Sequence, residues 1–234
     1  MPDATTSVGR VPPRWLRFLQ GAVRNPRYVA SVFPSSRSLL RHLIKLPCVQ
    51  TARVVVELGP GLGETTRALL ERMPRDGQLM CIEIVPQFVE ELRRIPDSRL
   101  CVVENSALRL RSLLELHHLR NPDVVVSGIP FAALSEHDAR VLIQNVRAVL
   151  APGGGFVAYQ FKSRVRALAG DYFGSPRTTF VPWNVPPLRI YEWRKTSSTS
   201  SPSRSVLRNN ADREGNLEQR DDTSHVWSKS PRTR

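Results

Sequence analysis

The stretch Glu57-Leu58-Gly59-Pro60-Gly61-Leu62-Gly63-Glu64 follows the apolar run Val54-Val55-Val56 and precedes a segment with helical periodicity. An apolar strand that ends in closely spaced glycines before a helix is typical of α/β folds that bind a ligand at the turn. A dinucleotide-binding turn has its third glycine five positions after the first, whereas here the third glycine comes at four. For the turn alone, an ordinary strand-to-helix bend is the structural alternative.

The acid at the end of this strand narrows the choice of ligand. A carboxylate at Glu57 is poorly suited to a pyrophosphate and well suited to a ligand that carries an ammonium group. The glycines let the backbone approach such a ligand, and the helix N-terminus can receive its carboxylate.

Strands and helices alternate at α/β spacing from Val54 onward. The predicted strands are 54–58, 79–84, 100–103, 124–127 and 156–161, and the predicted helices are 64–73, 88–94, 107–119 and 135–150. Apolar strands that are each followed by a helix imply a parallel sheet covered on both faces. Residues 178–183 and 188–193, joined across Asn184-Val185-Pro186-Pro187, are expected to form a closing antiparallel pair.

The charge is unevenly distributed along the chain. The 234 residues carry 34 Lys and Arg against 21 Asp and Glu, a formal charge of +13 that by itself suggests nucleic acid as a partner. Residues 1–53 hold nine basic side chains and one acid, while residues 54–151 hold eleven basic and thirteen acidic ones. The excess therefore lies on the flanks of a nearly neutral central block.

We divide the chain into a basic segment (1–53), a central domain (54–195) and a Ser/Arg-rich tail (196–234) that lacks apolar periodicity and is expected to be disordered. Residues 14–24 form an amphipathic helical pattern that combines apolar Trp15 and Phe18 with basic Arg14, Arg17 and Arg24. Such a helix either packs on the domain or lies in the interface of an anionic membrane. No apolar run is long enough to span a bilayer, and the three cysteines favour buried thiols over a disulfide framework or a metal site.

The E-x-G-x-G-x-G pattern resembles the cofactor loop of class I S-adenosylmethionine-dependent methyltransferases. That resemblance implies that Glu57, Gly59, Gly61 and Gly63 hold the cofactor, and that Glu83, followed by Ile84, receives its ribose hydroxyls. It also implies that Asn105, Ser106 and Ala107 meet the adenine edge, although Asn105 alone is equally a helix cap. The segment Ser127-Gly128-Ile129-Pro130-Phe131 falls where the class has its methyl-acceptor loop.

Within that class, the chain is similar to the bacterial phospholipid N-methyltransferases of the peripheral-membrane type. The matching segments are Pro34–Arg37, Glu57–Gly63, Ile82–Ile84, Ser127–Pro130 and Asn184–Pro187. The resemblance implies a Rossmann-like fold with a mostly parallel seven-stranded sheet and helices on both faces. The chain departs from the family pattern at Asn105, where an Asp is more usual, and in the strongly basic segment that follows Phe161.

The resemblance further implies methyl transfer from S-adenosylmethionine to the amine of phosphatidylethanolamine and its methylated derivatives, or of ornithine lipid. Ser127 and Gly128 would orient the amine through their backbone carbonyls, and Tyr159 or Tyr172 would contact the headgroup or relay its proton, unless they only pack. Ser35 and Ser36 would close over the cofactor, while Arg37 would hold the lipid phosphate. The partner would be the inner face of the cell membrane, to which the protein would bind peripherally from the cytoplasm. We expect no transmembrane segment, no stable nucleic-acid partner and no metal.

Two alternatives stay open at this point. The Ser127–Phe131 segment is similar to the N-[IL]-P-[FY] loop of RNA adenine N-methyltransferases, with Ser127 taken in place of the Asn. In those enzymes the aromatic side chain stacks on a flipped base. A lipid- or nucleic-acid-binding module without turnover is the second alternative, and the intact Glu57, Gly59, Gly61 and Glu83 argue against it.

Overall fold

The computed structural model describes residues 36–119, 121–184 and 187–196. Its centre is a seven-stranded sheet in the order β3-β2-β1-β4-β5-β7-β6. The strands are β1 (Val54–Leu58), β2 (Gln78–Glu83), β3 (Leu100–Glu104), β4 (Val124–Ser127), β5 (Gly155–Gln160), β6 (Arg177–Val181) and β7 (Leu188–Arg194). The first five pair in parallel, and β7 runs antiparallel to both β5 and β6. The predicted fold class, with its closing antiparallel pair, is therefore confirmed.

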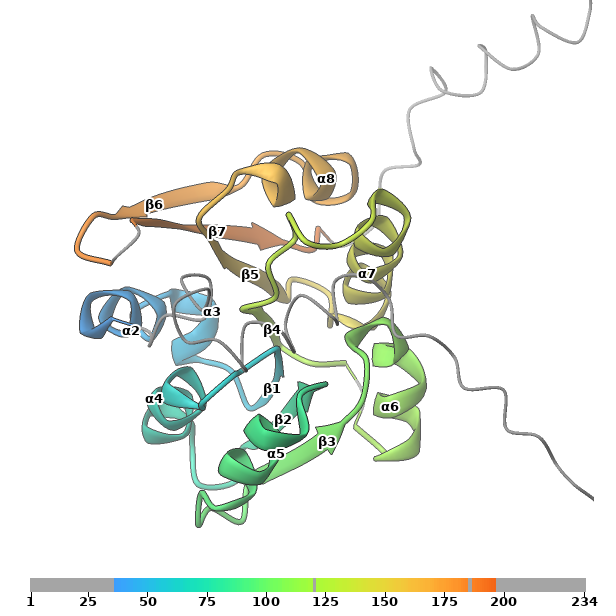
Figure 1. The fold of residues 1–234 in the computed structure, drawn as a ribbon. Helices are drawn as coiled ribbons and strands as arrows, with labels where there is room; N and C mark the ends of the chain where they lie inside the picture. The colour runs from blue at the N-terminus through green and yellow to red at the C-terminus, as the bar shows by residue number, and fades with distance from the viewer. Residues whose placement is uncertain (1–35, 120, 185–186, 197–234) are drawn as a thin grey trace, which may run out of the picture. The chain divides into compact units, whose positions relative to one another are not determined.

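Helices cover both faces of this sheet (Figure 1). They are α2 (Arg37–Leu43), α3 (Pro47–Gln50), α4 (Glu64–Arg72), α5 (Pro86–Arg93), the 3-10 turn η2 (Ala107–Arg109), α6 (Leu110–Leu116), α7 (Glu136–Val149) and α8 (Arg164–Phe173). One buried apolar cluster joins one face of the sheet to α6, α7 and α8, and a second joins the other face to α2, α3 and α4. Alternate strand residues feed the two clusters, since successive side chains point to opposite faces.

Helices α2 and α3 are elements that the sequence patterns did not predict. Ser36 caps α2 by accepting a hydrogen bond from the Leu39 backbone N–H, at 3.1 Å. Leu39 and Leu43 are completely buried in the same cluster as β1 and β4. The predicted boundary between residues 53 and 54 therefore does not separate two cores, because the chain from α2 onward packs on the sheet. Helix α8 was likewise not predicted.

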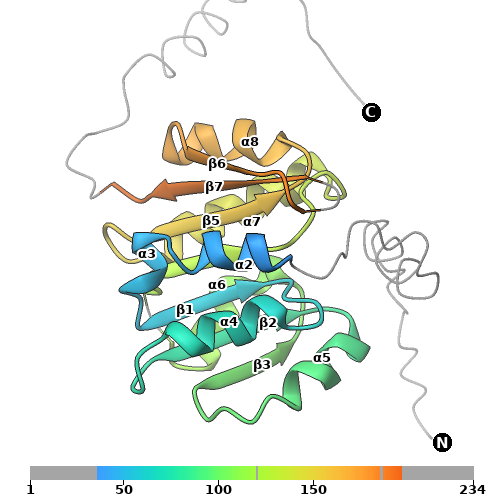
Figure 2. The ribbon, with the colours of Figure 1, turned by 90° about the vertical axis from the view of Figure 1, so that its left-hand side faces the viewer.

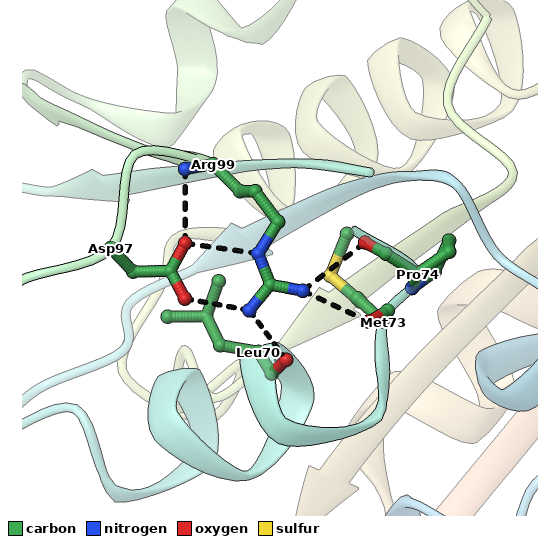
Figure 3. A network of polar contacts seen from close by, with 5 residues as sticks. All are labelled: Leu70, Met73, Pro74, Asp97 and Arg99. Atoms are coloured by element: carbon green, nitrogen blue, oxygen red, sulfur yellow. Dashed lines mark hydrogen bonds and ion pairs between the residues drawn. The ribbon is translucent and has the colours of Figure 1, made fainter. Parts of the chain in front are cut away.

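An ion pair fixes the far end of α4 (Figure 3). The Arg99 guanidinium donates to both carboxylate oxygens of Asp97, at 2.9 and 2.6 Å. It also donates to the backbone carbonyls of Leu70 (2.8 Å), Met73 (2.9 Å) and Pro74 (3.1 Å). Carbonyls in the last turn of a helix lack intrahelical partners, so Arg99 satisfies them and ties α4 to the loop that enters β3.

Among the residues that the structure describes, no helix is long and apolar enough to cross a membrane. The predicted amphipathic helix with Arg14, Trp15, Arg17, Phe18 and Arg24 lies outside the described residues, as do Ser35 and the tail beyond residue 196. Those expectations stay predictions.

Candidate cofactor and amine site

The glycine-rich turn joins the carboxyl end of β1 to the start of α4. Gly59, Gly61 and Gly63 all have positive φ angles, of 66°, 60° and 84°, a region that side-chain-bearing residues rarely adopt. A Cβ on Gly59 would lie 2.9 Å from the Ile129 side chain, and one on Gly63 would lie 2.9 Å from Leu92. The turn is therefore a tight backbone cradle that larger residues could not form.

Glu57 lies completely buried beneath this turn. Its Oε2 accepts a hydrogen bond from Thr66 Oγ1 at 2.6 Å and a longer one from Cys81 Sγ at 3.5 Å. Its Oε1 is buried and has no hydrogen-bond partner among the described residues. Burial raises the pKa of the Glu57 carboxyl to about 7, against the opposing effect of Thr66 and Cys81. A half-satisfied buried carboxylate is costly, so a cationic ligand beside it would relieve that cost.

Glu83 ends β2 next to the same turn. Its Oε2 accepts the Gly61 N–H at 3.1 Å, and its Oε1 accepts the N–H groups of Ile84 and Val85 at 2.8 and 3.0 Å. Burial raises the pKa of the Glu83 carboxyl, although these three backbone donors oppose the shift. Glu83 thus braces the glycine turn as well as lying where the ribose is predicted.

The segment after β3 lies beside Glu83, because the Asn105 N–H donates to the Glu83 carbonyl at 2.9 Å. The Asn105 side chain accepts the Ser106 N–H at 2.9 Å. Ser106, rather than Asn105, is the residue that caps the following turn, through a bond from the Leu108 N–H. Ala107 is buried against the core. The cap interpretation of Asn105 is therefore wrong, and the residue keeps its place beside Glu83.

The predicted acceptor loop begins at the carboxyl end of β4. Ser127 is fully buried, and its Oγ accepts the Ile129 N–H at 3.3 Å, while the Gly128 N–H donates to the Leu58 carbonyl at 2.9 Å. A Cβ on Gly128 would overlap the Tyr159 hydroxyl and lie 2.8 Å from the Gly59 carbonyl oxygen. Gly128 therefore brings the acceptor loop, the glycine turn and Tyr159 together at one point.

Two residues that sequence reasoning missed hold this loop in place. The Gln160 side chain accepts the Phe131 N–H at 3.1 Å and donates to the Ile129 carbonyl at 2.8 Å. Arg164 donates to the Leu134 carbonyl at 2.8 Å. A polar Gln160 at the end of the apolar fifth strand was the available signal, since a buried amide must find partners.

The two candidate tyrosines occupy opposite parts of the domain. The Tyr159 hydroxyl lies against Gly128 and 3.5 Å from Thr65 Oγ1, and burial raises its pKa well above the usual value. Tyr172, in the last turn of α8, instead accepts a hydrogen bond from Gln144 of α7 at 2.9 Å. Because α8 starts after the carboxyl end of β5 and runs back along the sheet, Tyr172 lies at the end of α8 that is farther from the predicted acceptor loop. Its predicted catalytic role stays a prediction.

The start of α2 also reaches this edge of the sheet. The Ser36 N–H donates to Asn184 Oδ1 at 3.2 Å, and Asn184 is buried in the turn between β6 and β7. This contact links the predicted Pro34–Arg37 and Asn184–Pro187 segments. Arg37 is exposed in the first turn of α2.

A mostly parallel sheet with this strand order, a glycine cradle after β1 and an acid at the end of β2 define a class I S-adenosylmethionine-dependent methyltransferase. A family model described as a methyltransferase domain matches residues 56–156. The ornithine lipid N-methyltransferase of Singulisphaera acidiphila is 32% identical over 184 residues, which cover 74% of this chain and 92% of that protein. The chain belongs to the lipid N-methyltransferase family of this class, and its cofactor is S-adenosylmethionine.

Two further comparisons place the chain among more distant relatives. Ribosomal RNA small subunit methyltransferase A of Leifsonia xyli is 30% identical over 177 residues, which cover 72% of this chain but 57% of that protein. The crystal structure of the N-methyltransferase NodS from Bradyrhizobium japonicum, in complex with S-adenosyl-L-homocysteine, superposes with a TM-score of 0.60. Its identity is 14%, with 78% of this chain and 98% of that chain covered, so it supports the fold alone.

Proposed function

We propose that the protein transfers methyl groups to the amine of a membrane-lipid headgroup, either ornithine lipid or phosphatidylethanolamine and its methylated derivatives. The observation that carries the proposal is the closed acceptor loop. Phe131 is fully buried and packs edge-to-face on Phe156, with ring centroids 6.5 Å apart. The loop therefore offers backbone groups and the Tyr159 hydroxyl to an acceptor, rather than an aromatic face. A small amine suits that environment.

The residues present fit the cofactor. Glu57 Oε1 is a buried acceptor without a described partner, and the glycine turn leaves no room for side chains at Gly59. We infer that Glu57 and the turn hold the amino-acid end of S-adenosylmethionine, and that Glu83 and Ile84 hold its ribose. Asn105, Ser106 and Ala107 would line the adenine. When bound, the cofactor supplies a methyl group that its sulfonium already activates for transfer.

The chain's own task is then to orient a neutral amine for in-line attack. The backbone carbonyls of Ser127 and Gly128 are the proposed acceptors for the amine hydrogens. Burial raises the pKa of Tyr159, which favours a protonated hydroxyl that contacts the headgroup over a role as the base. A dry site lowers the pKa of an ammonium group and so favours the reactive amine.

RNA adenine methylation is the second candidate, because a ribosomal RNA methyltransferase is among the relatives. Counting back from Ile129-Pro130-Phe131 places Gly128, rather than Ser127, at the position of the Asn in the N-[IL]-P-[FY] loop. The Tyr159 hydroxyl occupies the space that a side chain at Gly128 would need. Phe131 would also have to leave the core to stack on a base. Both features favour the lipid amine.

Incubation with labelled S-adenosylmethionine tests the choice. Vesicles that contain phosphatidylglycerol with either phosphatidylethanolamine or ornithine lipid should yield methylated lipid, identified by mass spectrometry. The Glu57→Ala variant should lose transfer while it keeps its circular dichroism spectrum. Methylation of unmodified small-subunit ribosomal RNA, with no transfer to either lipid, would refute the proposal in favour of the second candidate.

The proposed substrate also gives the basic amino-terminal segment a purpose. A helix over residues 14–24, with Arg14, Trp15, Arg17, Phe18 and Arg24, would bind the anionic inner face of the cell membrane from the cytoplasm. Arg37, exposed at the start of α2, would hold the lipid phosphate. Ser35 and Ser36 would close over the cofactor. These assignments depend on the lipid substrate.

A further inference from the structure

Three aromatic side chains are exposed on the side of the domain where the predicted acceptor loop (residues 127–131) lies. Phe161 is 55% exposed, Phe180 53% and Trp183 83%; we call these three residues the aromatic rim. Phe161 directly follows β5, and Trp183 follows β6, which is parallel to β5 because each strand is antiparallel to β7. Both therefore lie at the edge of the sheet where the acceptor loop begins. Figure 2 shows the turn between β6 and β7 on the side toward which β1 and β5 point.

Exposed apolar side chains are concentrated at this edge of the sheet. Five large hydrophobic residues are exposed within the described part of the chain. Three form the aromatic rim, Leu62 lies in the glycine turn at the same edge, and Leu116 lies elsewhere. Leu116 ends α6, which starts after the carboxyl end of β3 and runs back along the sheet. A concentration of apolar groups around one site marks an interaction surface, whereas scattered single residues do not.

The charge of the same surface selects the partner. Four basic residues lie at this edge: Lys162 follows β5, Arg164 and Arg166 are in the first turn of α8, and Arg189 is at the start of β7. Between Phe161 and Tyr191 the one further basic residue, Arg177, begins β6 at the opposite edge, and the one acid is Asp171. Asp171 is paired with Arg140 of α7 at 2.9 Å. The Arg189 guanidinium lies over the Phe180 ring, 5.4 Å from its centroid. Aromatic side chains beside basic ones complement an anionic lipid surface, where the rings enter the interface and the cations meet phosphates.

The residues next to two members of the rim are anchored in the fold. Asn184, next to Trp183, is buried and accepts the Ser36 N–H, and Phe161 follows Gln160, which anchors the acceptor loop. Contact of the rim with a bilayer would therefore set the position of the acceptor loop relative to the headgroups.

We propose that the aromatic rim and its flanking cations dock the domain on an anionic bilayer, with Trp183 and Phe161 inserted at the level of the headgroups beside the acceptor loop. The biological purpose of this docking rests on the proposed lipid substrate, whereas vesicle binding through the rim can be tested without it. It assigns to the folded domain a membrane contact that is separate from the predicted amino-terminal helix.

The direct test uses the fluorescence of Trp183. Of the four tryptophans, Trp15 and Trp227 are replaced by Phe in the full chain, which leaves exposed Trp183 and fully buried Trp193. Vesicles with 30% phosphatidylglycerol in phosphatidylcholine should shift the emission to shorter wavelength, and brominated acyl chains should quench it. Vesicles of phosphatidylcholine alone should have little effect. Unchanged emission on vesicles that demonstrably carry the bound protein would overturn the proposal.

Matched variants separate docking from catalysis. Phe161→Ala with Trp183→Ala should weaken vesicle binding at least tenfold, whereas Leu116→Ala should not. Lys162→Glu should weaken it by about an order of magnitude, since each basic side chain near an anionic surface contributes about fivefold; Arg75→Glu, in an exposed turn at the other edge, should change it little. Equal losses in the rim and control variants would overturn the proposal, as would concentration-dependent dimerisation through the rim without vesicle binding.

An activity comparison distinguishes this inference from the proposed function. The rim variants should lose methyl transfer to aminolipid in vesicles but keep it toward a dispersed short-chain aminolipid. If the unaltered protein binds vesicles through the rim but methylates neither substrate, the docking surface stands and the proposed function fails. If it methylates both and the rim variants bind vesicles normally, the function stands and the docking surface fails.

Discussion

At the scale of single residues, the charge state of Glu57 couples cofactor binding to pH. The carboxyl has a pKa of about 7 because it is buried, and a bound cation would lower that value. Binding at pH 7 should therefore release about half a proton, and affinity should rise as the pH increases through 7. Calorimetry with S-adenosylhomocysteine in two buffers of different ionisation enthalpy measures the release. Glu71→Gln, an exposed change on α4, should preserve it; tight binding without proton exchange would contradict the assignment.

The same residue makes the stability of the free domain depend on pH. The folded-state pKa lies above the unfolded value, so the folded state holds the proton more tightly and loses stability as the pH rises from about 4.5 through 7. A shift of this size corresponds to about 3 kcal/mol at pH 8. Urea unfolding at pH 5 and pH 8 should show a smaller pH dependence for Glu57→Gln than for the unaltered chain. An identical dependence in both would show that Glu57 ionises normally.

Tyr159 and Tyr172 offer a matched pair of hydroxyl deletions. Tyr159→Phe should leave cofactor affinity unchanged and lower kcat by about 10- to 100-fold, the effect of losing one hydrogen bond to a polar reacting group. Tyr172→Phe removes the bond from Gln144 and should affect stability by about 1 kcal/mol without changing kcat. Steady-state kinetics on a dispersed aminolipid, together with urea unfolding, measure both effects. If Tyr172→Phe lowers kcat and Tyr159→Phe does not, Tyr159 only packs.

At the scale of elements, the C-terminal end of α4 depends on a long-range cap. Hydrogen bonds from Arg99 hold the Asp97 pKa at about 2, so the pair contributes at neutral pH and is lost only as the pH falls toward that value. Arg99→Ala should lower the free energy of unfolding by about 2 kcal/mol, because it leaves partly buried helix carbonyls without donors. The exposed pair of Arg94 and Glu91 supplies the control, since Arg94→Ala should cost less than about 0.5 kcal/mol. If urea unfolding shows similar losses of unfolding free energy for Arg99→Ala and Arg94→Ala, Arg99 does not cap α4.

At the scale of the whole molecule, the sequence predicts the sheet well because apolar residues make up most of each strand from Val54 to Gln160. It also predicts the order of Glu57, Glu83 and the acceptor loop, since carboxyl ends of parallel strands meet at one edge. The contacts of Gln160 and the bond between Tyr172 and Gln144 depend on tertiary packing, which spacing along the chain does not encode. Helix α8 was missed for a local reason, because Gly170 and scattered basic residues weaken its periodicity.

The amino-terminal boundary gives a test of the domain as a unit. Leu39, Leu43 and Val49 are almost completely buried in the core between α2, α3 and the sheet. Each such side chain contributes about 1.5–3 kcal/mol on burial, so together they approach the 5–15 kcal/mol that typically separates folded from unfolded domains. A chain that begins at Val54, as the charge pattern alone suggested, should therefore fail to unfold cooperatively. Removal of residues 198–234, the tail that we expect to be disordered, should leave the urea midpoint unchanged. If the chain that begins at Val54 unfolds cooperatively at the normal urea midpoint, α2 and α3 are accessory to the fold.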